Sequence, residues 1–199
     1  RIIAQYITLL RGYNLYPKES TLIDLLKRFG HIASNGLISI PRFGSDTQAI
    51  ENKKKGLIGT LFAASWYTKQ HEDSLVASLD DDKARLWLSN NKYGNERADL
   101  VGLYYEEKKN TLHIQPIEVK TRDDSSDSTI TKEDGSASFA ITGHAANQVA
   151  SIAEMLKEIF SADADATDMF TSARREVLKY QIVSECFRNV HDVQWQKKW

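Results

Sequence analysis

Cysteine is almost absent from this sequence, with Cys186 the only one among 199 residues. A single cysteine excludes an internal disulfide and a multi-cysteine zinc site, and it fits a reducing cytoplasm. No uncharged stretch approaches the roughly 20 apolar residues that a membrane-spanning helix needs. The start also lacks the basic and apolar segments of a secretory signal. We therefore expect a cytoplasmic protein without a membrane partner.

Net charge is also small, because 26 basic residues stand against 27 acidic ones. This balance argues against a protein that coats nucleic acid through bulk charge. Basic residues gather locally at Lys53–Lys55, at Arg174 and Arg175, and at Lys197 and Lys198. Solvated surface is the commoner meaning of such runs, but a basic cleft would still serve an enzyme that acts on nucleic acid. The chain begins at Arg1, so we expect it to be a piece of a longer protein.

The first 45 residues predict an accessory segment. With 41% hydrophobic and 27% charged residues, the chain can form a packed core. Apolar residues at helical spacing predict short helices over 1–11 and 20–29. Residues 36–43 alternate loosely, which favours a strand or an extended arm. Residues 46–199 would then form the main domain.

The main domain shows patterns of both helices and strands. A helix over 46–70 is apolar nearly all round in its second half, which should be deeply buried together with Trp66. Gly56 and Gly59 in this helix would let another backbone come close. The remaining expected elements are a strand over 74–79, a helix over 80–88, strands over 99–105 and 111–121, a loop over 122–138, a helix through 149–160, and a helix over 167–188 with Phe170, Ala173, Val177, Tyr180 and Phe187 on one side. This order predicts an α/β fold in which helices flank a small mixed central sheet.

Three ionisable residues stand where the strand pattern would favour apolar ones. Asp99 opens the first hairpin strand, and Glu118 and Lys120 lie near the end of the second, on one side of it. Partners in an antiparallel hairpin have residue numbers with a constant sum. For Asp99 opposite Glu118 that sum is 217, which centres the hairpin in the polar turn over 106–110. The two carboxylates can thus be cross-strand neighbours, about 5 Å apart at Cβ.

Two like charges at this distance destabilise a sheet unless something neutralises them. A hard divalent cation such as Mg²⁺ or Mn²⁺ would do so, and Lys120 on the same side could orient a water beside a phosphate. The Glu-x-Lys pattern itself is weak, because it occurs four times in this chain. Only Glu118 and Lys120 alternate with apolar residues inside a strand. The alternative is an ordinary edge strand with its polar face in water.

These segments resemble the PD-(D/E)XK nuclease superfamily, and more narrowly the nuclease domains of bacterial restriction and defence proteins of the phosphorothioation-dependent type. The resemblance covers about residues 50–190 and rests on Leu-Val-Ala-Ser-Leu-Asp at 75–80, Ala-Arg-Leu-Trp-Leu at 84–88, Arg-Ala-Asp-Leu-Val-Gly-Leu at 97–103 and Ile-Glu-Val-Lys-Thr at 117–121. It implies a restriction-endonuclease-like fold and Mg²⁺-dependent (or Mn²⁺-dependent) DNA cleavage in restriction-modification or antiviral defence, with an ATPase or translocase region in the same chain or complex. Asp99 and Glu118 would be metal ligands and Lys120 the catalytic lysine.

Some positions depart from the family pattern. No carboxylate lies between Glu51 and Glu72 on the first core helix, so a ligand is missing unless Glu51 reaches the site. Gln148 resembles a site glutamine of some relatives, and an ordinary helix-surface glutamine fits equally well. Asp80 could replace Asp99 as a ligand, although a helix cap is favoured there. Five scattered histidines give no zinc spacing. The rival functions are a catalytically inactive DNA-binding or protein-interaction module of the same fold, and a purely structural domain.

Overall fold

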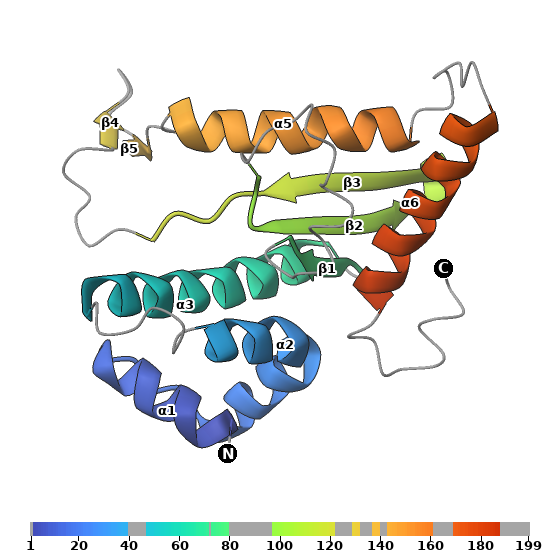
Figure 1. Cartoon of the computed structure of the whole chain (residues 1–199). Helices are drawn as coiled ribbons and strands as arrows, with labels where there is room; N and C mark the ends of the chain where they lie inside the picture. The colour runs from blue at the N-terminus through green and yellow to red at the C-terminus, as the bar shows by residue number, and fades with distance from the viewer. Residues whose placement is uncertain are drawn as a thin grey trace.

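The computed structural model of the chain describes residues 2–39, 47–71, 73–79, 97–121, 129–131, 137–139, 143–160 and 169–187. These residues form a mixed α/β fold, so the expected class is confirmed (Figure 1). The elements in chain order are α1 (Ile2–Gly12), α2 (Glu19–Ser39), α3 (Thr47–Gln70), β1 (Leu75–Ser78), β2 (Leu100–Glu106), the 3₁₀ helix η3 (Glu107–Lys109), β3 (Thr111–Ile117), β4 (Thr129–Thr131), β5 (Ala137–Phe139), α5 (Gly143–Phe160) and α6 (Met169–Phe187). The helix predicted over 80–88 lies outside the described residues. None of the described helices is long and apolar enough to cross a membrane.

The main sheet has three strands in the order β1-β2-β3. In the β1–β2 pairing Leu75 faces Leu103, and in the β2–β3 pairing Leu100 faces Ile117. Both pairings are antiparallel, so the mixed sheet expected from the sequence is wrong for the described strands. For β2 and β3 the reason is local, because a tight connection such as η3 permits only antiparallel pairing. The short strands β4 and β5 form a separate antiparallel pair within and just beyond the segment predicted as a loop.

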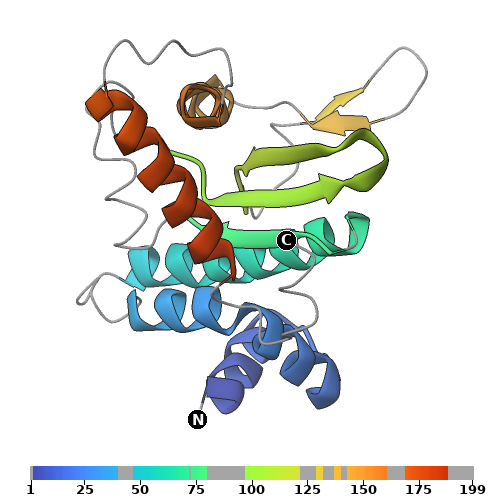
Figure 2. The ribbon, with the colours of Figure 1, turned by 90° about the vertical axis from the view of Figure 1, so that its right-hand side faces the viewer.

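Helices cover both faces of the sheet, as the sequence predicts. Figures 1 and 2 show α3 on one face and α5 on the other, with α6 packed across one end. Side chains alternate between the two layers along β2. Leu100 belongs to the core formed with α3, whereas Val101 and Leu103 belong to the core formed with α5 and α6. Glu118 and Lys120 follow β3 on the side turned towards α5.

The N-terminal segment packs on α3 and shares its apolar core. Helix α2 is longer than predicted: it continues to Ser39 across a kink at Phe29 (φ −119°, ψ 25°). The extended arm expected over 36–43 is therefore wrong for 36–39, and 40–43 lie outside the described residues. The helix continues because buried Leu22, Leu26 and Ile32 keep the helical spacing through the kink. Gly30, directly after Phe29, lowers the local helix propensity.

The second half of α3 is buried on one side only. Leu57, Leu61 and Tyr67 are buried, as predicted, but Phe62 is 52% exposed and Trp66 61% exposed. The prediction of a core Trp66 is therefore wrong. An apolar helix surface does not show by itself which of its sides will meet the sheet, and α3 has the sheet on one side and α2 on another.

Candidate functional site

The β2–β3 hairpin has the register that the sequence predicts. Each paired position from Leu100↔Ile117 to Glu106↔Thr111 has residue numbers that add up to 217. The turn closes through η3 and Asn110, whose backbone adopts the left-handed conformation (φ 51°) that asparagine tolerates. Asp99 and Glu118 occupy the next position of this register, just beyond the end of the ladder.

The Asp99 carboxylate ties the two chain segments together beyond the last strand pair. Its Oδ2 accepts a hydrogen bond of 2.7 Å from the backbone N–H of Val119. Its own backbone carbonyl accepts a bond of 2.8 Å from the N–H of Leu79, at the end of β1. Asp99 is thus held from both neighbours in the sheet. It lies beside the segment that carries Glu118 and Lys120.

Lys120 and Gln148 meet, which joins the hairpin to α5. The Lys120 ammonium forms an ion pair with Glu118 Oε1 and donates a hydrogen bond of 3.1 Å to Gln148 Oε1. The Gln148 amide in turn donates a bond of 2.8 Å to the carbonyl oxygen of Arg97. Gln148 bridges two segments of the hairpin region, so the structure brings Asp99, Glu118, Lys120 and Gln148 into one neighbourhood.

The Glu118 side chain is buried, whereas that of Lys120 is partly exposed. The exposed fractions are 6% for Glu118 and 40% for Lys120. One carboxylate oxygen is paired with Lys120, whereas the other, Oε2, is buried and has no hydrogen-bond partner. Leaving a buried acceptor unsatisfied costs about 1–3 kcal/mol, and more for a charged group. Glu118 Oε2 is therefore the atom of this neighbourhood that a bound cation would satisfy.

Gly59 lets α3 approach the segment after β3 closely. A Cβ built at this position would overlap the Thr121 methyl group and lie 3.0 Å from Val119 Cγ1. Close approach at Gly59 is therefore confirmed. At Gly56 no other element comes close, because no atom beyond the local helix backbone would lie within 4 Å of an added Cβ. The absence of a side chain at Gly59 thus lets α3 pack directly on Val119 and Thr121, the two neighbours of Lys120.

These residues fit a hard cation only as a two-carboxylate site. Mg²⁺ in proteins often binds one or two carboxylates and keeps several water ligands, and the orphaned Glu118 Oε2 is a suitable donor. The described residues contain no group of three or more His, Cys, Asp or Glu side chains placed to hold a metal ion. Asp80, the alternative ligand, lies outside the described residues. The chemistry of the donors matches Mg²⁺ or Mn²⁺ rather than zinc.

Glu51 is engaged elsewhere. Its carboxylate accepts hydrogen bonds of 2.8 Å from the Tyr13 hydroxyl and 2.6 Å from the Lys54 ammonium. The hydrogen bond from Lys54, and after it that from Tyr13, holds the pKa of Glu51 below its usual range. Glu51 lies eight positions before Gly59, which is about 12 Å along the helix axis. Glu51 therefore supports the N-terminal segment in this structure and does not complete the site.

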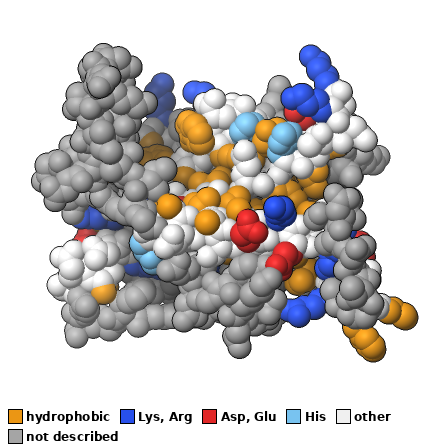
Figure 3. All heavy atoms as spheres, turned by 90° about the horizontal axis from the view of Figure 1, so that it is seen from above, with side chains coloured by type: hydrophobic (Ala, Val, Ile, Leu, Met, Phe, Trp, Pro, Cys, Tyr) orange, Lys and Arg blue, Asp and Glu red, His pale blue; other side chains and the backbone are white. Residues whose placement is uncertain are grey.

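The basic residues that gather in the sequence at Lys53–Lys55 and at Arg174 and Arg175 lie on two different helices, α3 and α6. Lys54 pairs with Glu51 at the start of α3. Arg174 is exposed on α6, whereas Arg175 is half-buried with its Nε buried. Figure 3 shows acidic side chains next to basic ones on the face seen from above. Within the described part of that face, the charges do not form one broad basic field.

Sequence reasoning missed a row of stacked rings on the opposite side of the hairpin. The Tyr104 ring lies between His71 and His113, with centroid distances of 4.1 Å and 4.3 Å and nearly parallel planes. His113 and Tyr104 are register partners, so that contact could have been predicted from the sum of 217. His71 comes from the end of α3, and no local pattern indicates its position. The two imidazoles lie on opposite faces of one ring, which does not favour a shared metal ion.

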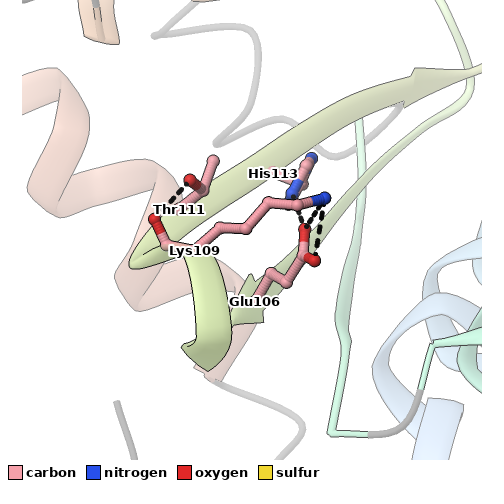
Figure 4. A network of polar contacts seen from close by, with 4 residues as sticks. All are labelled: Glu106, Lys109, Thr111 and His113. Atoms are coloured by element: carbon pink, nitrogen blue, oxygen red, sulfur yellow. Dashed lines mark hydrogen bonds and ion pairs between the residues drawn. The ribbon is translucent and has the colours of Figure 1, made fainter.

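Polar contacts continue this row to the tip of the hairpin. Glu106 accepts a bond from Lys109 and lies 3.1 Å from His113 Nε2, and Thr111 donates to the Lys109 carbonyl (Figure 4). The hydrogen bond from Lys109, followed by that with His113, lowers the pKa of Glu106. This network stabilises the turn, and even its nearest member in the sequence, His113, lies five residues before Glu118.

Comparison of the chain with known proteins gives no relative: no family model, no curated protein and no solved structure matches it.

Proposed function

We propose that this chain is a metal-dependent DNA endonuclease domain with a restriction-endonuclease-like arrangement, part of a larger bacterial restriction or anti-phage defence protein. The observation that supports it most is Glu118, whose buried Oε2 has no partner while Asp99 occupies the facing register position. A cation between these carboxylates would satisfy that oxygen and offset their repulsion. The resemblance of the two hairpin segments to PD-(D/E)XK nucleases adds the substrate class.

The side chains of the site suit phosphodiester hydrolysis. Asp99 and Glu118 would hold the Mg²⁺ or Mn²⁺ ion, which when bound stabilises the charge that develops on the phosphoryl oxygens. Lysine has three N–H donors, and two of those of Lys120 go to Glu118 Oε1 and Gln148 Oε1. The third remains available to a phosphate oxygen or a water. Gln148 fixes the direction of the ammonium through its bond to Arg97.

A second candidate function is a nuclease-fold module that binds DNA or protein without cleaving. The contacts of Glu51 with Tyr13 and Lys54 favour it, because they keep the nearest helix carboxylate away from Asp99 and Glu118. A site with two carboxylates binds a cation less strongly than a site with three. Cleavage and DNA affinity must therefore be measured separately.

The test is cleavage of supercoiled plasmid by the full chain in Mg²⁺ or Mn²⁺. Glu118→Gln and Lys120→Met each remove one charge and keep the side-chain length, and we expect each to lower the nicking rate by about 100-fold or more. Glu107→Gln and Lys108→Met are the matched controls, because both lie exposed in η3 away from the site. We expect both controls to cleave at the wild-type rate.

Three results distinguish the candidates. Metal-dependent nicking that only the site variants lose supports the endonuclease. DNA binding by gel shift without nicking in either metal overturns it in favour of the inactive module. Nicking that the site variants and the η3 controls share equally would show that the activity comes from a contaminant.

A further inference from the structure

Helix α6 turns a row of large apolar side chains towards solvent. Met169 is 79% exposed, Phe170 88%, Val177 55% and Tyr180 76%. Phe170, exposed Ala173, Val177 and Tyr180 follow the spacing i, i+3, i+7 and i+10 on one side of the helix, and Met169 lies directly before Phe170. We call this set the α6 stripe. The sequence predicts that Phe170, Ala173, Val177, Tyr180 and Phe187 share a side, and for the first four the structure shows that this side faces outwards.

The opposite side of α6 already packs on the protein. Ile182 is fully buried, and Leu178 and Val183 pack against the core that α5 forms with the sheet. The α6 stripe therefore has no role in the core. Figures 1 and 2 show α6 at the end of the sheet with its outer side turned away from the other labelled elements. Scattered single apolar residues on a surface need no explanation, but a continuous row marks an interaction site.

The size of the stripe approaches that of a stable interface. A fully exposed Phe or Tyr side chain offers about 200 Å², and Met and Val offer less, so at these exposed fractions the α6 stripe offers roughly 500 Å². A standard specific interface takes about 800 Å² from each partner. The stems of flanking Arg174 and Gln181, both exposed, can supply the difference. Two such surfaces would therefore suffice for a modest dimer.

The arrangement of the stripe is self-complementary. Phe170 and Tyr180 lie at equal distances from position 175, and so do Ala173 and Val177. In an antiparallel pair of α6 helices, Phe170 of each copy would contact Tyr180 of the other copy, so this contact would occur two times in the dimer. The smaller Ala173 and Val177 would meet at the centre and let the helices approach. Such an isologous contact is what a two-fold symmetric dimer requires.

The charges beside the stripe do not favour another kind of partner. Glu176 and Lys179 form an ion pair of 2.6 Å on one flank, and Arg174 lies on the other. The signs are mixed, so an anionic membrane or an acidic protein gains little. We propose that the α6 stripe is the interface of a two-fold homodimer, formed by antiparallel packing of α6 against α6 of a second copy.

The test is the mass of the full chain by sedimentation equilibrium between 1 and about 100 µM, a range that brackets weak homodimers. We expect the wild type to reach twice the 22.6 kDa of one chain. Phe170→Glu and Val177→Glu should each weaken the dimer by about 100-fold or more, because a carboxylate would be buried in the interface. Phe62→Glu is the matched control: Phe62 is also exposed, but it lies on α3, and the variant should dimerise normally.

A cross-linking experiment tests the register independently of any loss of folding. In a Cys186→Ser background, a mixture of Phe170→Cys and Tyr180→Cys chains should form disulfides much faster than either variant alone. Equivalent positions of the two copies would lie about 15 Å apart, whereas unlike positions would be in contact. A wild-type chain that stays single at 100 µM overturns the proposal. So does a dimer that both α6 glutamates leave intact, because another surface must then form it.

Discussion

Replacing Gly59 by alanine adds a methyl group where α3 meets the segment that carries Glu118 and Lys120. The added Cβ would overlap the methyl group of Thr121 and touch Val119 Cγ1 at 3.0 Å. Thr121 is exposed and can rotate its side chain, but Val119 packs against the core with α3 and has less room to move. The substitution should therefore push the segment away from α3.

Two opposing effects set the size of the change in stability. Alanine in place of glycine inside a helix stabilises it by about 1 kcal/mol. Overpacking in a filled contact costs about 1–3 kcal/mol. For Gly59→Ala we expect a net loss near 1 kcal/mol. Gly56→Ala has only the favourable effect, because no atom lies within 4 Å of its added Cβ, and it should gain up to about 1 kcal/mol.

The measurement is urea unfolding of the two variants and the wild type, followed by circular dichroism. The variants should differ by about 2 kcal/mol, or roughly 4–8 °C in Tm for a chain of this length. Gly59→Ala combined with Thr121→Ser should recover part of the loss, since serine lacks the overlapping methyl group. Equal stabilisation by both alanines would show that α3 does not pack on this segment, and would refute the reasoning.

Two further predictions concern polar contacts of the hairpin. In the folded chain the pKa of Glu106 lies below its ordinary 4.5, chiefly because the carboxylate accepts a hydrogen bond from Lys109. The ionised carboxylate therefore stabilises the fold above pH 4.5, and this stabilisation disappears as the pH falls through the pKa of Glu106 in the folded chain. The wild type should therefore be more stable than Glu106→Gln at pH 7 and equal to it in strong acid; a constant difference in unfolding midpoint would contradict this. Gln148→Leu removes a bridge between two segments and should cost about 1–2 kcal/mol in urea unfolding, whereas Asn147→Leu, at the exposed neighbouring position, should change stability by less than about 0.5 kcal/mol. Equal effects of the two leucines would rule out the bridge.

The hairpin could be predicted from the sequence because its information is local. Once the turn is placed, antiparallel pairing fixes every partner, and the register with sum 217 follows. The approach of Asp99 to the segment that carries Glu118 is a consequence of that register. The meeting of Lys120 with Gln148 is different. It joins positions 28 residues apart, and only the resemblance to a nuclease family pointed to the glutamine.

Other features could not be predicted because a periodic pattern does not say which side of a helix faces the core. Helix α6 has apolar residues on two sides, and the side with Ile182 is buried whereas the side with Tyr180 is exposed. On α3, the sheet and the N-terminal helices cover Tyr67 and leave Trp66 exposed. The position of His71 against Tyr104 likewise depends on how α3 lies across the sheet.

Direct binding of Mn²⁺ tests the central claim about Asp99 and Glu118. Isothermal titration of the full chain should show one Mn²⁺ site, which Glu118→Gln and Asp99→Asn each weaken by at least about tenfold, while Glu107→Gln in η3 binds like the wild type. Mg²⁺ should compete for the same site. A wild-type chain that binds no Mn²⁺ at millimolar concentration, or one whose affinity survives both site substitutions, would contradict the account.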